Sequence, residues 1–196
     1  MVSSAKTKRL PDLGPFHNRP DELALYTPLV GSTMLELGGK INGPLTYKAY
    51  FEALGFEHVS IDWDGKYGAV KRDLRQPQWL EFGQEWSMVC NMGCTEHISD
   101  QRAVWENIHM LTAVGGVYVG QTPYHDGKSW WWHGEHYPTE AFFESFAELN
   151  NWDIQRIYVD RDVPNQNLYV RMQKLGDKPF TTPDLKLIHY NVRRSR

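Results

Sequence analysis

The stretch TMLELGG, at residues 33–39, decides the fold that we expect for this chain. A short apolar run that ends on two glycines is typical of a buried strand followed by a tight turn. Apolar residues then recur at near-helical spacing from Leu45 to Leu54, and Gly55 can end that helix. The stretch EHVSID, at 57–62, indicates a second strand. The first sixty residues therefore predict one strand–helix–strand unit.

Helices and strands keep alternating along the rest of the chain. We expect, in order, a strand at 69–73, a short helix after Pro77, a strand at 86–91, a helix from a cap at Ser99 or Asp100 to about Ala113 where Gly115-Gly116 ends it, a strand at 117–121, a helix capped by Thr139, and a hairpin of strands at 152–160 and 167–174. Such alternation predicts an α/β fold, in which a mostly parallel, doubly wound Rossmann-like sheet is covered on both faces.

The domain organisation follows from length and composition. A chain of 196 residues with 41% hydrophobic and 23% charged residues suits a single globular domain. We expect an irregular N-terminal arm at 1–20, one domain at 21–176 that begins with a short helix at 21–29, and a C-terminal tail at 177–196.

Bulk properties also restrict the partners and the compartment. A net charge of -3 provides no overall basic field for nucleic acid. Two cysteines cannot build a disulfide framework, and the chain contains neither an apolar run long enough to span a membrane nor an N-terminal signal sequence. We therefore expect a cytoplasmic protein without a membrane partner, and its oligomeric state stays open.

Polar residues gather where the predicted strands end, which is where parallel sheets bind ligands. Gly38 and Gly39 allow close approach to the backbone after the first strand, and Asp62 ends the second strand roughly 25 residues later, where a carboxylate can accept hydrogen bonds from ribose hydroxyls. Asp73 ends the next strand. Each acid alone could be a turn residue or a cap, but together they outline an adenosine pocket.

The order of these motifs resembles a known family. LELGGKING, VSID, KRDL, CNMGCTEHI and GGVYVGQTP are similar to the motifs of class I S-adenosylmethionine-dependent methyltransferases, in sequence order over about residues 30–174. The Glu96-His97 pair that opens the helix after the fourth strand is common in the small-molecule branch of that family. The resemblance implies a seven-stranded sheet whose last strand is antiparallel.

The resemblance also implies roles for single residues of the cofactor site. It places Glu36, Gly38 and Gly39 under the methionine and ribose, Asp62 on the ribose hydroxyls, Trp63 against the adenine, Asp73 at the adenine amino group, Leu74 beneath the ring, and Asn91 and Met92 beside the sulfonium. Lys40 and Asn42 stand where the family usually has glycines. Lys40 could reach the carboxylate of the cofactor, and Asn42-Gly43 matches a variant loop of a related subgroup.

The stretch HDGKSWWWHGEHYP, at 125–138, follows the fifth predicted strand and would cross the acceptor pocket. Its aromatic side chains can present flat apolar area to an acceptor, or they can pack the loop onto the domain or onto a second subunit. We expect substrate contacts from Tyr124, Trp130, Trp131 and Trp132, and proton transfer from His97, His125, His133 or His136.

A metal hypothesis on this loop combines His133, Glu135 and His136 with His125 or Asp126. These residues lack the fixed helical spacing of a zincin motif, so the sequence predicts no metal site. His97 could also fix the turn after the fourth strand as the partner of Glu96 instead of acting as a base.

The function that we expect is methyl transfer to oxygen or nitrogen of a small-molecule or saccharide-like acceptor. One alternative is a non-catalytic protein that binds S-adenosylmethionine or S-adenosylhomocysteine. Another is a nicotinamide-dependent oxidoreductase, against which the missing third glycine argues. A nucleic-acid acceptor is not expected, because the chain has NMGC, at 91–94, where an Asn/Asp-Pro-Pro-aromatic motif would stand.

Overall fold

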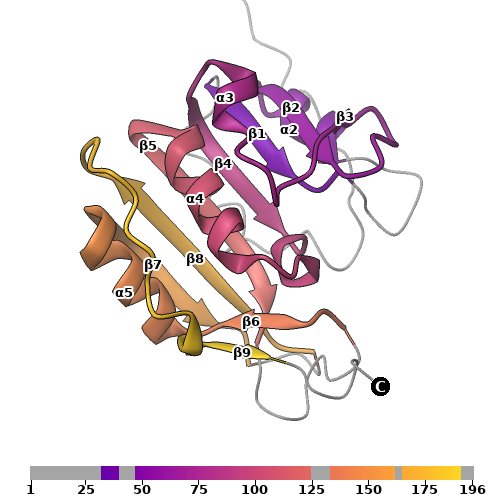
Figure 1. Cartoon of the computed structure of the whole chain (residues 1–196). Helices are drawn as coiled ribbons and strands as arrows, with labels where there is room; N and C mark the ends of the chain where they lie inside the picture. The colour runs from indigo at the N-terminus through magenta and orange to yellow at the C-terminus, as the bar shows by residue number, and fades with distance from the viewer. Residues whose placement is uncertain (1–31, 40–46, 125–132, 162–164, 191–196) are drawn as a thin grey trace, which may run out of the picture.

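The computed structural model describes four stretches of the chain, residues 32–39, 47–124, 133–161 and 165–190. They build a large sheet with helices packed against it (Figure 1). Within these stretches the sheet has seven strands in the order β3-β2-β1-β4-β5-β8-β7. The arm predicted at 1–20 and the helix predicted at 21–29 lie outside the described residues.

The first five strands of the sheet are parallel, as the sequence predicts. They are β1 (Thr33–Leu37), β2 (Glu57–Asp62), β3 (Val70–Lys71), β4 (Trp86–Met92) and β5 (Thr112–Pro123). Leu37 is in register with both Ile61 and Asn91, so β1, β2 and β4 end at the same edge. The chain order reverses between β1 and β4, and such a switch point is where sheets of this type bind ligands.

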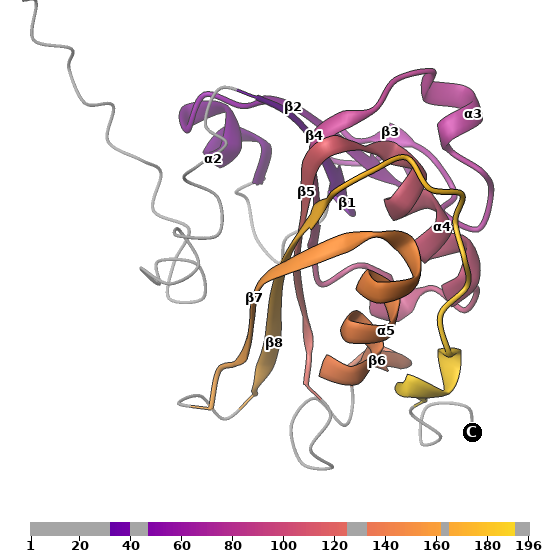
Figure 2. The ribbon, with the colours of Figure 1, turned by 90° about the vertical axis from the view of Figure 1, so that its left-hand side faces the viewer.

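Helices lie on both sides of this sheet. Figure 2 shows α2 (Tyr47–Ala53) on one side, and α3 (Trp79–Phe82), α4 (Gln101–Leu111) and α5 (Glu140–Asn150) on the other. The predicted caps are confirmed: Asp100 accepts a hydrogen bond from the Ala103 amide, and Thr139 accepts one from the Phe142 amide.

Two apolar clusters fill the space between the helices and the sheet. On the α4 and α5 side, the Trp105 ring lies 4.8 Å from Phe142 and 5.4 Å from Phe143, over Leu35 and Leu37 of β1. On the other side, Phe51 of α2 belongs to a second cluster with Met34, Met88 and Cys90. The strands are therefore apolar on both faces, which confirms the doubly wound arrangement.

The sheet ends with the predicted hairpin, β7 (Trp152–Val159) and β8 (Asn167–Lys174). β8 lies between β5 and β7 and is antiparallel to both of them. The antiparallel last strand implied by the resemblance is therefore confirmed.

The boundary between α4 and β5 differs from the prediction. The helix ends at Leu111 and the strand begins at Thr112, so the glycines at 115–116 lie inside the strand, at a shift of register against β4. The buried Lys174 ammonium explains the early end, because it donates to the carbonyls of His109 and Thr112 at 3.0 Å each. A cation at the C-terminus of a helix satisfies its last carbonyls and complements its dipole.

The segment from residue 177 to 190, predicted as a tail, packs along the domain. Its strand β9 (Ile188–Tyr190), which follows the turn η3 (Leu185–Leu187), pairs with β6 (His136–Pro138) in a separate antiparallel sheet. The side chain of Asn150 bonds to both backbone groups of Thr181, at 2.7 and 2.9 Å. Within the described stretches, no helix has the length and apolar character needed to cross a membrane.

Candidate functional site

The glycine turn at the end of β1 requires glycine for two reasons. Gly38 has φ 82°, in the left-handed region that side chains disfavour, and its amide donates to the Ile61 carbonyl at 2.8 Å. A Cβ on Gly38 would also lie 2.7 Å from Cβ of Cys94. The turn is thus held against β2 on one side and against the residues that follow β4 on the other.

Asp62 stands beside this turn at the end of β2. Its carboxylate accepts from the Gly39 amide and from the Asp64 amide, each at 3.3 Å. The adjacent Trp63 is 75% exposed. A carboxylate fixed beside a glycine turn at a switch point can receive ribose hydroxyls, and an open indole face can pack on a flat ring.

Glu36 is buried under the turn, on the side of the sheet that α2 covers. Its Oε2 lies 3.0 Å from Nε2 of His58 on β2, and the His58 ring stacks on Phe51 at 5.6 Å. Burial raises the pKa of the Glu36 carboxyl, and the hydrogen bond from His58 opposes this shift. The sequence prediction omitted His58, although alternation along β2 places it on the same buried face as Ser60.

Glu36→Gln is expected to make the stability of the protein less sensitive to rising pH above about 4.5. The pKa of Glu36 is higher in the folded state than its usual value of 4.5, so the folded state retains a proton that the unfolded state loses. The wild type therefore loses stability as pH rises above about 4.5, through the folded-state pKa, and the variant lacks that loss. Thermal melts of the wild type and the variant at a series of pH values above 4.5 measure the effect, with Glu57→Gln at an exposed position of β2 as control. A difference in melting temperature between wild type and Glu36→Gln that does not change with pH would contradict the prediction.

Asp73 and Leu74, both predicted to contact the adenine, differ in their exposure to solvent. The Asp73 carboxylate pairs with the Arg75 guanidinium at 2.7 Å, and this hydrogen bond holds the Asp73 pKa below its ordinary value. The Leu74 side chain is buried in the core, and the Leu74 carbonyl accepts from Asn107 at 2.8 Å. Asp73 is therefore partly exposed at the rim, while Leu74 supports the loop from below.

Asn91 shapes the turn at the end of β4. Its side-chain oxygen accepts from the amides of Cys94 and Thr95, at 3.0 and 3.1 Å, and its amide donates to the Thr95 hydroxyl. This network starts the short helix η2 (Thr95–His97) directly after the strand. Met92, the last residue of β4, is half-buried directly before this turn.

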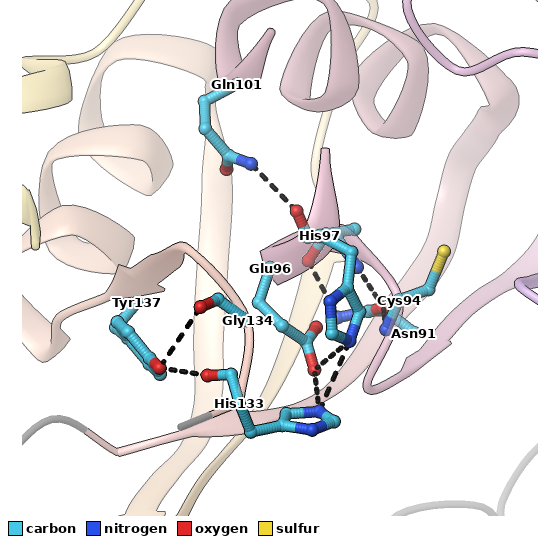
Figure 3. Close-up of polar contacts among 9 residues, drawn as sticks. Asn91, Cys94, Glu96, His97, Gln101, His133, Gly134 and Tyr137 are labelled. Carbon is cyan, nitrogen blue, oxygen red and sulfur yellow. Dashed lines mark hydrogen bonds and ion pairs between the residues drawn. The ribbon is translucent and has the colours of Figure 1, made fainter. Parts of the chain in front are cut away.

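Three titratable side chains meet after this turn (Figure 3). Oε1 of the buried Glu96 lies 3.7 Å from Nε2 of His97 and 3.4 Å from Nε2 of His133, and the two imidazole nitrogens are 3.2 Å apart. The sequence prediction named both histidines as candidate bases and Glu96 only as a partner that could fix His97, without linking either residue to His133. The structure brings all three residues together across the turn and the loop before β6.

His136 occupies a different position from this cluster. Its ring is half-buried against Tyr190 of β9, at 5.2 Å, and desolvation lowers its pKa. It opens onto a cleft of about 540 Å³ between the start of α4 and the β6–β9 sheet. The cleft is lined by Ser99, Asp100, Gln101, Arg102, His136, Leu185, Ile188 and Tyr190.

Tyr124 follows the end of β5, half-buried, with the Arg161 guanidinium 5.6 Å from its ring centre. The remaining predicted site residues lie outside the described stretches: Lys40, Asn42, His125, Trp130, Trp131 and Trp132.

Comparison with known proteins identifies the fold. No family model and no curated protein matches the sequence. Among solved structures, 1,6-didemethyltoxoflavin-N1-methyltransferase of Burkholderia thailandensis, which was crystallised with S-adenosylhomocysteine, is similar with a TM-score of 0.60 at 15% identity. The match covers 81% of this chain and 78% of that chain.

Two further structures cover most of both chains. The N-methyltransferase NodS of Bradyrhizobium japonicum is similar with a TM-score of 0.55 at 16% identity, over 81% of this chain and 90% of that one. The fibrillarin pre-rRNA processing protein of Methanococcus jannaschii has a TM-score of 0.55 at 12% identity, over 90% and 87%. The chain therefore has the Rossmann-like fold of class I methyltransferases.

Proposed function

We propose that this chain is an S-adenosylmethionine-dependent methyltransferase that acts on oxygen or nitrogen of a small-molecule or saccharide-like acceptor. One observation carries the proposal. The Asp62 carboxylate is held by the Gly39 amide beside the left-handed Gly38 turn, at the switch point between β1 and β4. That arrangement is suited to an adenosine ribose, and the fold is that of enzymes which use this cofactor.

The charge at this edge favours a cationic cofactor over a dinucleotide. The pKa of the Cys94 thiol is raised mainly by burial, and the carboxylates of Glu96, Asp62 and Glu36 add to the shift, so acidic side chains gather beside the Gly38 turn. A sulfonium is stabilised by such surroundings, whereas the pyrophosphate of a nicotinamide cofactor is repelled. The same effect keeps the Cys94 thiol protonated, which protects it from methylation.

The cofactor would be held by residues at the ends of the parallel strands. Asp62 holds the ribose, the exposed Trp63 ring packs on the adenine, and the rim carboxylate of Asp73 turns from Arg75 toward the adenine amino group. Asn91 and Met92 border the reactive methyl group, and Lys40 and Asn42 complete the loop over the methionine part. The bound cofactor supplies an electrophilic methyl carbon, and the residues around it position the acceptor in line with the breaking bond.

The acceptor side of the proposal involves the end of β5 and the loop before β6. Tyr124 and Trp130–Trp132 would contact the acceptor, and the proton that it loses would pass to His97, His125, His133 or His136. Two of the similar proteins are named as N-methyltransferases, and one of them was crystallised with the small molecule 1,6-didemethyltoxoflavin, which supports a small acceptor. The fibrillarin likeness makes RNA the competitor to include in an acceptor panel.

Calorimetric titration with S-adenosylmethionine and S-adenosylhomocysteine tests the cofactor. Asp62→Asn is expected to weaken binding by about 10- to 100-fold, because hydrogen bonds to a charged group contribute about 1.5–3 kcal/mol each. Asp153→Asn, at an exposed position of β7, is the matched control and should bind as the wild type does.

The other outcomes separate the alternatives. Absence of binding in the wild type, or binding of a nicotinamide dinucleotide instead, contradicts the proposal. Binding without consumption of the cofactor across a broad acceptor panel indicates a non-catalytic binding protein.

A further inference from the structure

Glu96, His97 and His133 present one ligand atom each to a common point. The three atoms are Oε1 of Glu96 and Nε2 of the two histidines, and the distances among them are 3.2, 3.4 and 3.7 Å. The histidine rings are nearly perpendicular, at 80°, with their centres 4.6 Å apart. Figure 3 shows all three side chains directed toward the same space from two separate segments.

These distances match the spacing of ligands around a small cation. Zinc binds imidazole nitrogen at about 2.0–2.1 Å and carboxylate oxygen at about 2.0–2.2 Å, so adjacent ligand atoms in a tetrahedral site are about 3.3–3.5 Å apart. The three distances observed between the ligand atoms, 3.2, 3.4 and 3.7 Å, lie close to this spacing. An ion could therefore be bound without rearrangement of the backbone.

The burial of Glu96 supplies an independent reason for a cation. Its side chain is 0% exposed, and neither carboxylate oxygen accepts a hydrogen bond from any described residue. A buried carboxylate without such donors is costly, and a bound cation removes the cost. The two imidazoles that face Oε1 of Glu96 carry a positive charge only when protonated, and a metal ion bound between them would supply one.

The backbone holds the three ligands in this arrangement. Gly134, at φ 70°, packs so close to Glu96 that an added Cβ would lie 2.7 Å from its Cγ. The Glu135 amide donates to the Glu96 carbonyl at 2.8 Å, and the Tyr137 hydroxyl donates to the His133 carbonyl. The loop that carries His133 is therefore attached to η2, and such support is what ligand sets need for precise geometry.

We propose that Glu96, His97 and His133 form a binding site for a divalent transition metal, with Zn²⁺ or a first-row neighbour as the ion. Two imidazoles and one carboxylate suit these metals, whereas Ca²⁺ and Mg²⁺ prefer oxygen ligands throughout. Three protein ligands leave at least one position open, which is typical of a catalytic site and not of a structural one.

The location of the site suggests what the open position holds. Cys94 directly precedes η2, which carries Glu96 and His97, and Cys94 packs against the Gly38 turn. The ion therefore lies beside the proposed cofactor pocket, and an acceptor hydroxyl would be bound near the reactive methyl. This assignment of acceptor chemistry rests on the proposed function, whereas metal binding does not.

Methyl transfer to such a hydroxyl conserves atoms and charge. Because His97 and His133 would be occupied as ligands, the metal-bound hydroxyl would release its proton to water, and its oxygen would form the bond to the methyl carbon. The carbon–sulfur bond breaks, its electron pair stays on sulfur, and the products are a methyl ether and neutral S-adenosylhomocysteine.

Cobalt titration of protein treated with a chelator and then dialysed tests the site. Co²⁺ should bind once per chain and produce the visible d–d absorption of a four- or five-coordinate site with nitrogen ligands, and Zn²⁺ should displace it. Glu96→Gln and His133→Ala should each weaken Co²⁺ binding by more than about 100-fold. Substitution of a residue that only supports a ligand typically weakens metal binding by about 10- to 100-fold. Glu135→Gln and His189→Ala are matched controls with the same side-chain types nearby, and both should bind as the wild type does.

Three results would overturn the proposal: no stoichiometric binding in the wild type, unchanged affinity in both ligand variants, or equal losses in the controls. Any of them would leave Glu96, His97 and His133 as a buried carboxylate beside two imidazoles, without a role as metal ligands. Melting curves establish that each variant is folded. Calorimetry with S-adenosylhomocysteine on the metal-depleted wild type gives the cofactor result separately, so failure of the metal site and failure of the methyltransferase proposal are distinguishable.

Discussion

Gly38→Ala is expected to lower the free energy of unfolding by about 2–5 kcal/mol and to remove cofactor binding. The left-handed backbone conformation costs a residue with a Cβ about 1–2 kcal/mol, and overpacking costs about 1–3 kcal/mol more. The overpacking arises because the new Cβ would lie 2.7 Å from Cβ and 2.9 Å from Sγ of Cys94. Relief of this contact requires β1 and the turn after β4 to separate, and this opens the floor of the proposed pocket.

Gly68→Ala provides a matched control for this prediction. Gly68 has the same φ of 82°, and nothing lies within 4 Å of an added Cβ, so only the backbone cost of about 1–2 kcal/mol applies. Denaturant unfolding of both variants measures the difference. The double variant Gly38→Ala with Cys94→Gly removes the steric overlap and should recover most of the difference in unfolding free energy between Gly38→Ala and Gly68→Ala. Equal losses in Gly38→Ala and Gly68→Ala would contradict the close contact.

Lys174→Met is expected to destabilise the protein by about 3 kcal/mol, because methionine keeps the volume but leaves two carbonyls without their donor. Lys174 is 1% exposed, and its ammonium donates to the His109 and Thr112 carbonyls, where α4 passes into β5. Thermal and denaturant unfolding measure the loss.

Asp177→Asn separates the buried hydrogen bonds from the ion pair. Asp177 lies 3.5 Å from the Lys174 ammonium but is 77% exposed, and exposed pairs contribute little. This variant should stay within about 0.5 kcal/mol of the wild type. A larger loss in Asp177→Asn than in Lys174→Met would show that the ion pair matters more than the carbonyl contacts.

The large sheet and the cofactor edge could be predicted from local patterns. Apolar runs that end on Gly38, Asp62 and Asn91 mark three strand ends, and parallel pairing brings strand ends to one edge whatever the details of packing. The Thr139 cap is equally local, because it depends on an amide three residues away. The fold and half of the site thus follow from residues that act on their near neighbours.

The rest of the site depends on contacts between distant segments. His97 and His133 are 36 residues apart, and their approach requires the Gly134 backbone to fit against Glu96. The strands β6 and β9 have three residues each, too few to show a periodicity, and their pairing appears only in the folded domain. His58 was missed because a polar residue inside a strand has no local signature of its buried partner Glu36.

The pairing of β6 with β9 has a consequence for the order in which the protein is completed. β9 is made after all seven strands of the large sheet, yet it binds the strand whose Tyr137 holds the His133 carbonyl. During synthesis the strands of the large sheet can pair before the partner strand of β6 has been made. The support that β6 gives to the His133 segment is therefore complete only after β9 has been synthesised and has paired with β6.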